Sequence, residues 1–205
     1  DCIVRNNFVY NNFRTGIYMG AYLGFDGLST KSCYVVNNTL FNNNLKGGQL
    51  DGTNNYLKVN DRDNSSEGEI RLSELCEENV IANNIIYALS DRDIFIRKYT
   101  TSGKNNFIGG NIYFSPNKKN HKWMWDGKEY TDFSAWQAAS GDRTSVFNVD
   151  PLLKSTRTRQ PDLHLKSASL AIGTGLVYRG YVIGMFDIDG DKRCEIHSVN
   201  IGADQ

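Results

Sequence analysis

The 205-residue chain is long enough to bury one sizeable core, and one elongated domain is the simplest arrangement. Its 23 Lys and Arg residues balance 23 Asp and Glu residues, so charge gives no reason to expect binding to nucleic acid or to an anionic membrane. No stretch approaches the roughly 20 consecutive apolar residues that span a bilayer. We therefore expect no membrane span.

A five-residue pattern occurs four times in the first 114 residues. Each copy has an Asn-containing pair, two mostly apolar residues and an aromatic ring. Counted on the second residue of each pair, the copies are 31, 46 and 27 residues apart. Repeats of this length indicate a solenoid, because one unit cannot bury its apolar face alone. The copies are Asn6-Asn7-Phe8-Val9-Tyr10, Asn37-Asn38-Thr39-Leu40-Phe41, Asn83-Asn84-Ile85-Ile86-Tyr87 and Gly110-Asn111-Ile112-Tyr113-Phe114.

A second strand follows the pattern at a fixed interval. Ile17 lies ten residues after Asn7, and Ile94 lies ten residues after Asn84. After Asn38 the matching strand is Glu69 to Leu72, so residues 45–66 are predicted to be an inserted loop. We expect the Asn to stack its amide on neighbouring turns and the aromatic ring to pack inside the coil.

These features predict an all-β fold, a parallel β-helix with a short helix and a closing C-terminal segment. Residues 1–116 would form the turns, which Pro116 would end, and residues 117–205 would close the same domain. Because an open first turn exposes strand edges, we expect an upstream part of the same protein to cover it.

The segment after Pro116 is rich in aromatic residues. Thr131 to Ala139 predicts a short capped helix ended by Gly141. Trp123, Trp125 and Trp136 fit two hypotheses, a platform for sugar rings or packing of the helix against the coil.

The four cysteines have no metal-like spacing. Cys2 and Cys33 each lie five residues before a repeat Asn, so they should stack on neighbouring turns. They are predicted to be small inward-facing thiols, with a disulfide as the alternative.

Several short motifs of the C-terminal third add to the signal of the repeats. They are Tyr130-Thr131-Asp132-Phe133-Ser134-Ala135-Trp136-Gln137, Val149-Asp150-Pro151-Leu152-Leu153, Asp162-Leu163-His164-Leu165, Asp187-Ile188-Asp189-Gly190-Asp191-Lys192-Arg193 and Asn200-Ile201-Gly202-Ala203-Asp204. On these motifs and the repeats, the chain resembles bacterial right-handed parallel β-helix proteins of the pectate-lyase-like class, and the resemblance covers nearly the whole chain. This chain has Ser169-Leu170-Ala171-Ile172-Gly173 where the family more often has Ser-Pro-Ala-Ile-Asp.

The resemblance implies a right-handed coil and a bacterial protein that is secreted or exposed at the cell surface and acts on polysaccharide or oligosaccharide. It does not choose among polysaccharide lyases, glycoside hydrolases, epimerases and non-catalytic adhesins, because one fold hosts many functions.

The outward side chains of the second strands form the predicted glycan-binding face. Placing Ile17, Ile70 and Ile94 inward puts Glu69 beside Asp93 on neighbouring turns, about 4.8 Å apart. Aromatic rings and cations would line the same surface, as a polysaccharide groove requires. The predicted catalytic residues are Glu69 and Asp93, and the predicted substrate-binding residues are Tyr18, Tyr22, Arg71, Phe95 and Arg97.

Three functional hypotheses follow from this face. A glycoside hydrolase would use Glu69 and Asp93 as its carboxylate pair, and their expected spacing suits retention. A lyase acting on uronic acids would instead use Arg71, Arg97 and Lys98, or Ca²⁺, to neutralise the substrate carboxylate. The third hypothesis is a non-catalytic carbohydrate-binding or adhesin-like solenoid.

The segment Asp187-Ile188-Asp189-Gly190-Asp191 has the alternating oxygens of a Ca²⁺ loop, so Asp187, Asp189 and Asp191 are candidate metal ligands. It lacks the Glu that would complete an EF-hand loop. His121, His164 and His197 have no nucleophilic partner nearby in sequence and are expected to be structural or exposed.

Overall fold

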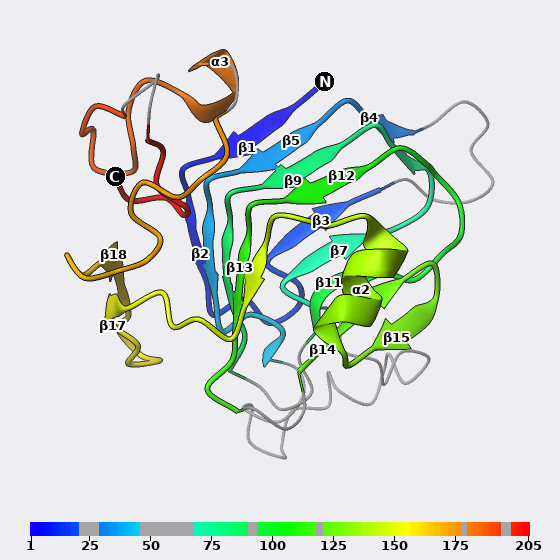
Figure 1. Cartoon of the computed structure of the whole chain (residues 1–205), viewed down its shortest axis with the longest axis horizontal. Coiled ribbons are helices and arrows are strands. Elements are labelled where there is room, and N and C mark those ends of the chain that lie inside the picture. The colour runs from blue at the N-terminus through cyan, green and yellow to red at the C-terminus, as the bar shows by residue number, and fades with distance from the viewer. Residues whose placement is uncertain (21–28, 46–67, 90–93, 118–120, 178–179, 194–197) are drawn as a thin grey trace.

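Three parallel β-sheets form most of the molecule in this computed structural model, which describes residues 1–20, 29–45, 68–89, 94–117, 121–177, 180–193 and 198–205 (Figure 1). Each repeating unit gives one short strand to each sheet, and equivalent strands of successive units pair side by side. This mostly β architecture with stacked parallel strands is consistent with the predicted solenoid. The first sheet contains β1 (Ile3–Arg5), β5 (Tyr34–Val36), β9 (Val80–Ala82) and β12 (Phe107–Gly109); the second contains β2 (Phe8–Tyr10), β6 (Thr39–Phe41), β10 (Ile85–Tyr87), β13 (Ile112–Phe114) and β16 (Val146–Phe147); the third contains β3 (Ile17–Met19), β7 (Ile70–Leu72), β11 (Ile94–Lys98), β14 (Lys122–Trp125) and the antiparallel β15 (Lys128–Tyr130).

The remaining elements are short. Two small sheets pair β4 (Thr30–Lys31) with β8 (Cys76–Glu77) and β17 (Leu153–Ser155) with β18 (Asp162–Leu165). The helices within the described residues are α2 (Phe133–Ser140) and α3 (Gly180–Ile183). Among the described residues no helix has the length and apolar character needed to cross a membrane. The predicted insertion, residues 45–66, lies outside the described residues except for Leu45.

A ladder of asparagine side chains joins the units at the bend before the second sheet. The Nδ2 atoms of Asn7, Asn38 and Asn84 each donate to the Oδ1 atom of the next Asn, at 2.9, 3.1 and 3.0 Å, ending at Asn111. The backbone N–H of each donor residue bonds the same oxygen. Ser145 ends the series by accepting from the Asn111 backbone N–H at 2.8 Å. The predicted stacking of the repeat Asn is confirmed.

The residue before each ladder Asn has a separate role in the repeat. Asn6, Asn37, Asn83 and Gly110 have φ angles of 57°, 53°, 56° and 64°. This left-handed conformation is strained for most side chains but accessible to Asn and Gly. The pair therefore combines a residue that makes the bend with a residue that bonds the next unit.

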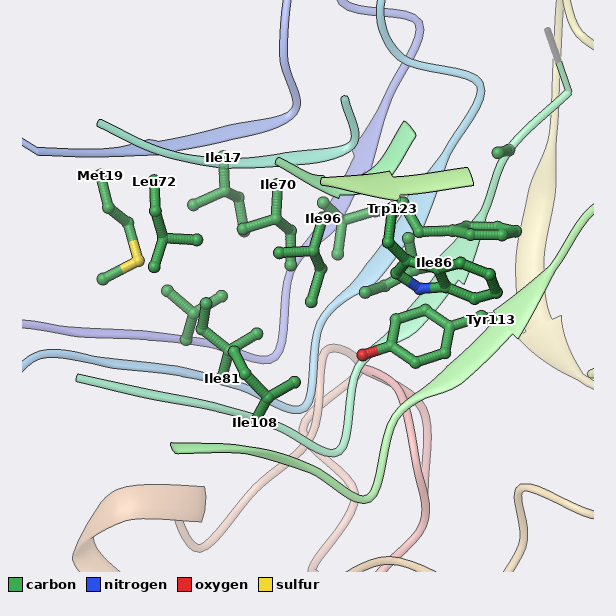
Figure 2. Close-up of a cluster of buried hydrophobic side chains, with 14 of the residues drawn as sticks. Ile17, Met19, Ile70, Leu72, Ile81, Ile86, Ile96, Ile108, Tyr113 and Trp123 are labelled. Atoms are coloured by element: carbon green, nitrogen blue, oxygen red, sulfur yellow. The ribbon is translucent and has the colours of Figure 1, made fainter. Parts of the chain in front are cut away.

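The aromatic ring of the repeat faces away from the interior of the coil. Leu40, Ile86 and Tyr113, at the centre of the strands, belong to the main core between the sheets. Figure 2 shows Ile86 and Tyr113 within this core. The rings one position later pack in a second core, with centroids 5.2 and 4.9 Å apart, under Leu153, Leu163 and Ile201 of the C-terminal segment. The prediction that the ring packs inside the coil is wrong, because alternation along a strand sends neighbouring side chains to opposite faces. The stacked rings are Phe41, Tyr87 and Phe114.

The register of the third sheet agrees with the prediction in one place and differs in another. Ile17 pairs with Ile70 as expected, but Ile70 pairs with Ile96 and not with Ile94. The register between β11 and β14 also shifts, because two residues of β11, Phe95 and Ile96, oppose one residue of β14, Trp123, between the paired positions. Such a bulge breaks the alternation of inward and outward side chains.

Parallel pairing continues beyond Pro116. Strand β14 pairs with β11 in the third sheet, and β16 pairs with β13 in the second. The units therefore do not end at Pro116, and part of the predicted closing segment belongs to the same sheets. The C-terminal segment, orange to red in Figure 1, lies outside the coil alongside β1 and β2.

Helix α2 and the tryptophans extend the main core. Asp132 caps the helix by accepting from the Ala135 N–H at 2.8 Å, and Gly141 ends it with φ 76°, as predicted. Trp123 and Trp136 are fully buried and stack with centroids 5.8 Å apart. These two rings pack the helix against the coil, so they are not available as a sugar platform.

The cysteines of the described segments are free thiols. Cys33 packs against the main core, as expected, whereas Cys2 is exposed, contrary to the inward placement predicted. Cys76 is buried, and burial raises the pKa of its thiol to about 11. Cys194 lies outside the described residues.

Candidate functional site

The outward face of the third sheet brings together three of the predicted substrate-binding residues. Tyr18 pairs with Arg71, and Arg71 pairs with Arg97, on the adjacent strands β3, β7 and β11. Residues paired across parallel strands point to the same face of a sheet. Tyr18, Arg71 and Arg97 therefore form one outward column, although Arg97 stands where Phe95 was expected.

Tyrosine rings and guanidinium groups alternate along this face. The Cζ atom of Arg71 lies 5.4 Å from the Tyr18 ring centroid and 4.8 Å from the Tyr99 ring centroid. The Cζ atom of Arg97 lies 4.9 Å from the centroid of the same Tyr99 ring. Each such cation–π contact contributes about 0.5–1 kcal/mol when exposed and more when desolvated. The stack holds the Arg71 side chain against both rings.

Tyr99 is the residue of this face that was not among the predicted site residues. Its hydroxyl lies 3.0 Å from Ser73 Oγ in a hydrogen bond. The predicted register of β11, which aligned Ile94 with Ile70, differs by two residues from the observed pairing of Ile96 with Ile70. Gly20 leaves room for this arrangement, since a Cβ atom there would lie 2.5 Å from the Ser73 Cβ.

The face differs in exposure from one end to the other. Tyr18 is 43% exposed and Arg71 is half-buried, whereas Arg97 is 5% exposed. A ligand approaching from solvent would therefore meet Tyr18 and Arg71 first. Arg97 is buried and packs against the Tyr99 ring.

Glu69, predicted as a catalytic carboxylate on this face, is buried at the end of a second Asn ladder. Asn12 Nδ2 donates to Asn43 Oδ1 at 2.7 Å. Asn43 then donates from its backbone N–H to Glu69 Oε1 at 2.9 Å and from its Nδ2 to Glu69 Oε2 at 2.5 Å. Both carboxylate oxygens serve the bend between sheets, and the side chain is 0% exposed. The outward placement of Glu69 is therefore wrong.

Replacing Glu69 with glutamine should destabilise the fold by about 2–3 kcal/mol. The amide nitrogen of the glutamine would replace one carboxylate oxygen, so one of the two Asn43 donors would lose its acceptor. Urea unfolding monitored by tryptophan fluorescence measures this change. The matched control is Glu78→Gln, since exposed Glu78 forms a surface pair with Lys31 at 3.6 Å, worth less than about 1 kcal/mol. Unchanged stability with lost glycan cleavage would restore the catalytic interpretation of Glu69.

Phe95 was predicted to bind substrate but belongs to the main core. Its ring lies 5.0 Å from Trp123 and 5.5 Å from Tyr113, centroid to centroid, and it is 0% exposed. The bulge in β11 causes this, because it places the adjacent residues Phe95 and Ile96 both in the core.

Two predicted site residues, Asp93 and Tyr22, lie outside the described residues. Lys98, a candidate cation for the lyase hypothesis, is buried. Its Nζ atom donates to the Thr100 carbonyl oxygen at 2.7 Å and pairs with Asp126. Lys98 therefore stabilises the end of the third sheet and does not reach the outward face.

The predicted Ca²⁺ loop does not converge on one point. Asp187 is buried, and its Oδ1 accepts from the backbone N–H groups of Asp189 and Asp191 at 2.9 and 2.8 Å. Its Oδ2 accepts from the Gln205 backbone N–H at 2.8 Å. Asp187 shapes the loop and Asp191 is exposed, so the three carboxylates do not form the predicted ligand set.

Asp189 instead lies beside His164 and Asp204, which the sequence analysis did not group with it. His164 Nε2 lies 2.9 Å from Asp189 Oδ2, and Asp204 completes a group whose ligand atoms lie within 4.8 Å of one another. His164 Nδ1 bonds Asp162, which lowers the pKa of the Asp162 carboxyl. Burial lowers the pKa of His164, but the bond to Asp162 and the charge of Asp189 outweigh it and raise the pKa above its usual value.

No protein-family model matches the chain, and no solved structure matches it significantly. Among curated proteins it is similar to the uncharacterized protein YwoF of Bacillus subtilis (strain 168), with 30% identity over 152 residues. The match covers 74% of this chain and 28% of YwoF. The chain thus spans well under a third of that relative.

Proposed function

We propose that the chain is part of a right-handed parallel β-helix of the pectate-lyase-like class that binds an acidic polysaccharide on the outward face of its third sheet. The observation that carries the proposal is the column of Tyr18, Arg71 and Arg97 with Tyr99 packed between the guanidinium groups. An exposed ring suits the apolar face of a sugar, and a guanidinium group bonds a uronate carboxylate with charge assistance.

Binding is favoured over glycoside hydrolysis for a specific reason. The hydrolase hypothesis needs two carboxylates beside the bound sugar. Glu69 accepts two hydrogen bonds from Asn43 and is buried, so it does not supply one of them.

A uronate lyase is the second candidate. Arg71 could neutralise the substrate carboxylate, which lowers the cost of removing the neighbouring C5 proton, and the Tyr99 hydroxyl lies on the same face. Ultraviolet absorbance of an unsaturated product would identify this activity, whereas new reducing ends without that absorbance would identify a hydrolase.

The proposal includes export of the protein from a bacterial cell, since an acidic polysaccharide ligand would lie outside the cell. Fractionation of the producing cells would test this location, and recovery of the protein in the cytoplasm alone would contradict it.

Replacing Arg71 with alanine should weaken binding of an oligogalacturonate at least tenfold, because a hydrogen bond to a charged group contributes about 1.5–3 kcal/mol. Calorimetric titration of the folded variants measures this. Tyr18→Ala should also weaken binding, and the matched control is Tyr10→Ala, since Tyr10 is 45% exposed in the same unit but lies on the second sheet.

A second control separates local contact from general charge. Lys128→Ala removes one exposed positive charge from the same sheet, on β15, and should leave the affinity unchanged. If Arg71→Ala and Lys128→Ala weaken binding equally, or if the methyl-esterified oligomer binds as well as the acid, the proposed face is wrong.

A further inference from the structure

Three segments that are distant in sequence bring metal-binding atoms together beside the C-terminal segment. His164 lies in β18, Asp189 lies in the loop after α3, and Asp204 is the penultimate residue. Their nearest ligand atoms lie within 4.8 Å of one another. The group lies apart from the outward face of the third sheet and plays no part in the proposed glycan binding.

The orientation of His164 suits metal binding. Its Nδ1 atom bonds Asp162, which leaves Nε2 directed at Asp189, 2.9 Å away. A carboxylate on the far nitrogen is the usual support of a metal-bound histidine, because it fixes the tautomer and the ring orientation. Two residues of one strand, Asp162 and His164, therefore supply the ligand and its support.

The distances need only small adjustments to admit an ion. Two ligands at about 2.0–2.1 Å from Zn²⁺ lie roughly 3.3 Å apart in a tetrahedral site and at most about 4.1 Å apart in any geometry. The His164 to Asp189 distance of 2.9 Å is a few tenths of an ångström below the tetrahedral value. The widest separation in the group exceeds the upper limit by at most about 0.7 Å, given the 4.8 Å bound.

Asp204 is held beside His164 by a hydrogen bond to β18. Its Oδ2 atom accepts from the Leu165 backbone N–H at 2.7 Å, next to His164 in the chain. One carboxylate oxygen is thus fixed by the strand, and the second is free of that bond. Asp189 is exposed and His164 is partly exposed, so an ion could enter from solvent.

The charges around the group favour a cation. Asp162, Asp189 and Asp204 surround one imidazole, and among the described residues Arg193 and Lys154 are positive groups that interact with these carboxylates. The Arg193 guanidinium is buried and donates to the Gly202 and Ala203 carbonyl oxygens at 3.0 and 2.8 Å. A divalent ion would offset the remaining negative charge and displace the proton from His164 Nε2 to solvent.

We propose that His164, Asp189 and Asp204 bind a divalent first-row transition metal ion, with Zn²⁺ as the representative, and that the ion ties the C-terminal segment to β18. An imidazole nitrogen with two carboxylates suits such ions, whereas Ca²⁺ prefers six to eight oxygen ligands. The carboxylates of Asp187 and Asp191, which a Ca²⁺ loop would use, do not join this group. Water would complete the coordination.

The test is metal binding by the whole chain after treatment with a chelator. Calorimetric titration with Zn²⁺ should show one site, and Co²⁺ should give the visible absorbance of a bound ion. Asp189→Asn should weaken binding at least tenfold, while Asp191→Asn, which removes an exposed carboxylate of the same loop, should leave it unchanged. Saturating Zn²⁺ should raise the melting temperature of the wild-type protein and not that of Asp189→Asn.

The design separates lost binding from lost folding. Wild type and Asp189→Asn should melt at similar temperatures in chelator, since Asp189 is exposed. His164→Gln provides a second variant that should lose the Co²⁺ spectrum. The proposal is overturned by absence of Zn²⁺ and Co²⁺ binding, by equal effects of Asp189→Asn and Asp191→Asn, or by a preference for Ca²⁺. In the first case the group is an ion pair network only.

Discussion

Replacing Asn84 with alanine is expected to lower the free energy of unfolding by about 3–5 kcal/mol. The substitution removes the oxygen that accepts from both the backbone N–H and the Nδ2 of Asn38. The Asn38 backbone N–H is buried and loses its acceptor, which costs about 1–3 kcal/mol. The Asn38 Nδ2 loses one bond but keeps the Val4 and Val36 carbonyl oxygens, at 2.9 and 3.1 Å. The Val35 carbonyl oxygen also loses the Asn84 Nδ2 donor, at 2.9 Å. Urea unfolding at equilibrium measures the change.

Position in the ladder provides the control for Asn84. Asn7→Ala, at the open end of the same ladder, leaves the Asn38 oxygen with the backbone N–H of residue 7 and is expected to cost only about 1 kcal/mol. A central cost that is no larger than the terminal cost would show that the side-chain ladder does not contribute to stability in the way proposed. An unchanged dependence on denaturant concentration in both variants would confirm that stability alone has changed.

The sequence was sufficient to predict the Asn ladder, because a polar residue that recurs at the same place in every unit has an equivalent partner above and below it. The same reasoning could have found the second ladder. Asn12 and Asn43 are separated by 31 residues, as Asn7 and Asn38 are, and Glu69 follows them. The prediction for Glu69 used only the alternation of its own strand. It therefore placed Glu69 on the outward face, whereas the side chain is buried against Asn43.

The register of β11 could not be predicted from its apolar pattern. Ile94 and Ile96 are both apolar and have the same parity, so a shift of two residues preserves the alternation. The bulge then places Phe95 in the core, a position that alternation excludes. The packing of Phe95 against Tyr113 and against Trp123, on the adjacent strand of the sheet, distinguishes these arrangements.

The group around His164 could not be predicted from sequence spacing either. Asp189 and Asp204 reach it from separate segments, 25 and 40 residues away. The local signal was the Asp162-Leu163-His164 alternation, which places the acid and the imidazole on one face of β18. The predicted metal ligand Asp189 does lie in the group, but its neighbours in the chain do not.

Two cores on opposite faces of the second sheet explain why the repeat carries both apolar and aromatic residues. Ile86 faces the main core inside the coil, whereas Tyr87 faces the C-terminal segment. The C-terminal segment therefore covers apolar surface that the units expose on their own. We infer that the coil and this segment stabilise each other, since the second core forms only where their apolar faces meet.

Replacing Trp123 with alanine is expected to lower the free energy of unfolding by about 3–5 kcal/mol, the usual cost of removing a large aromatic side chain from a core. Trp123 is 0% exposed and connects β14 to both the coil and α2. Its ring centroid lies 5.0 Å from that of Phe95, 5.6 Å from that of Phe133 and 5.8 Å from that of Trp136. The cavity would open where the fourth unit meets the helix, so both parts should lose stability together.

Trp125→Ala is the matched control, because Trp125 is on the same strand but only half-buried, and it contacts Trp136 edge to face at 5.6 Å. Its cost should be smaller than that of Trp123→Ala, and urea unfolding of both variants measures the difference. If Trp123→Ala instead kept wild-type stability and lost oligogalacturonate binding, Trp123 would belong to a sugar platform and its assignment to the core would be wrong. Because a fully buried ring cannot stack on a sugar, we expect loss of stability, with affinity per folded molecule unchanged.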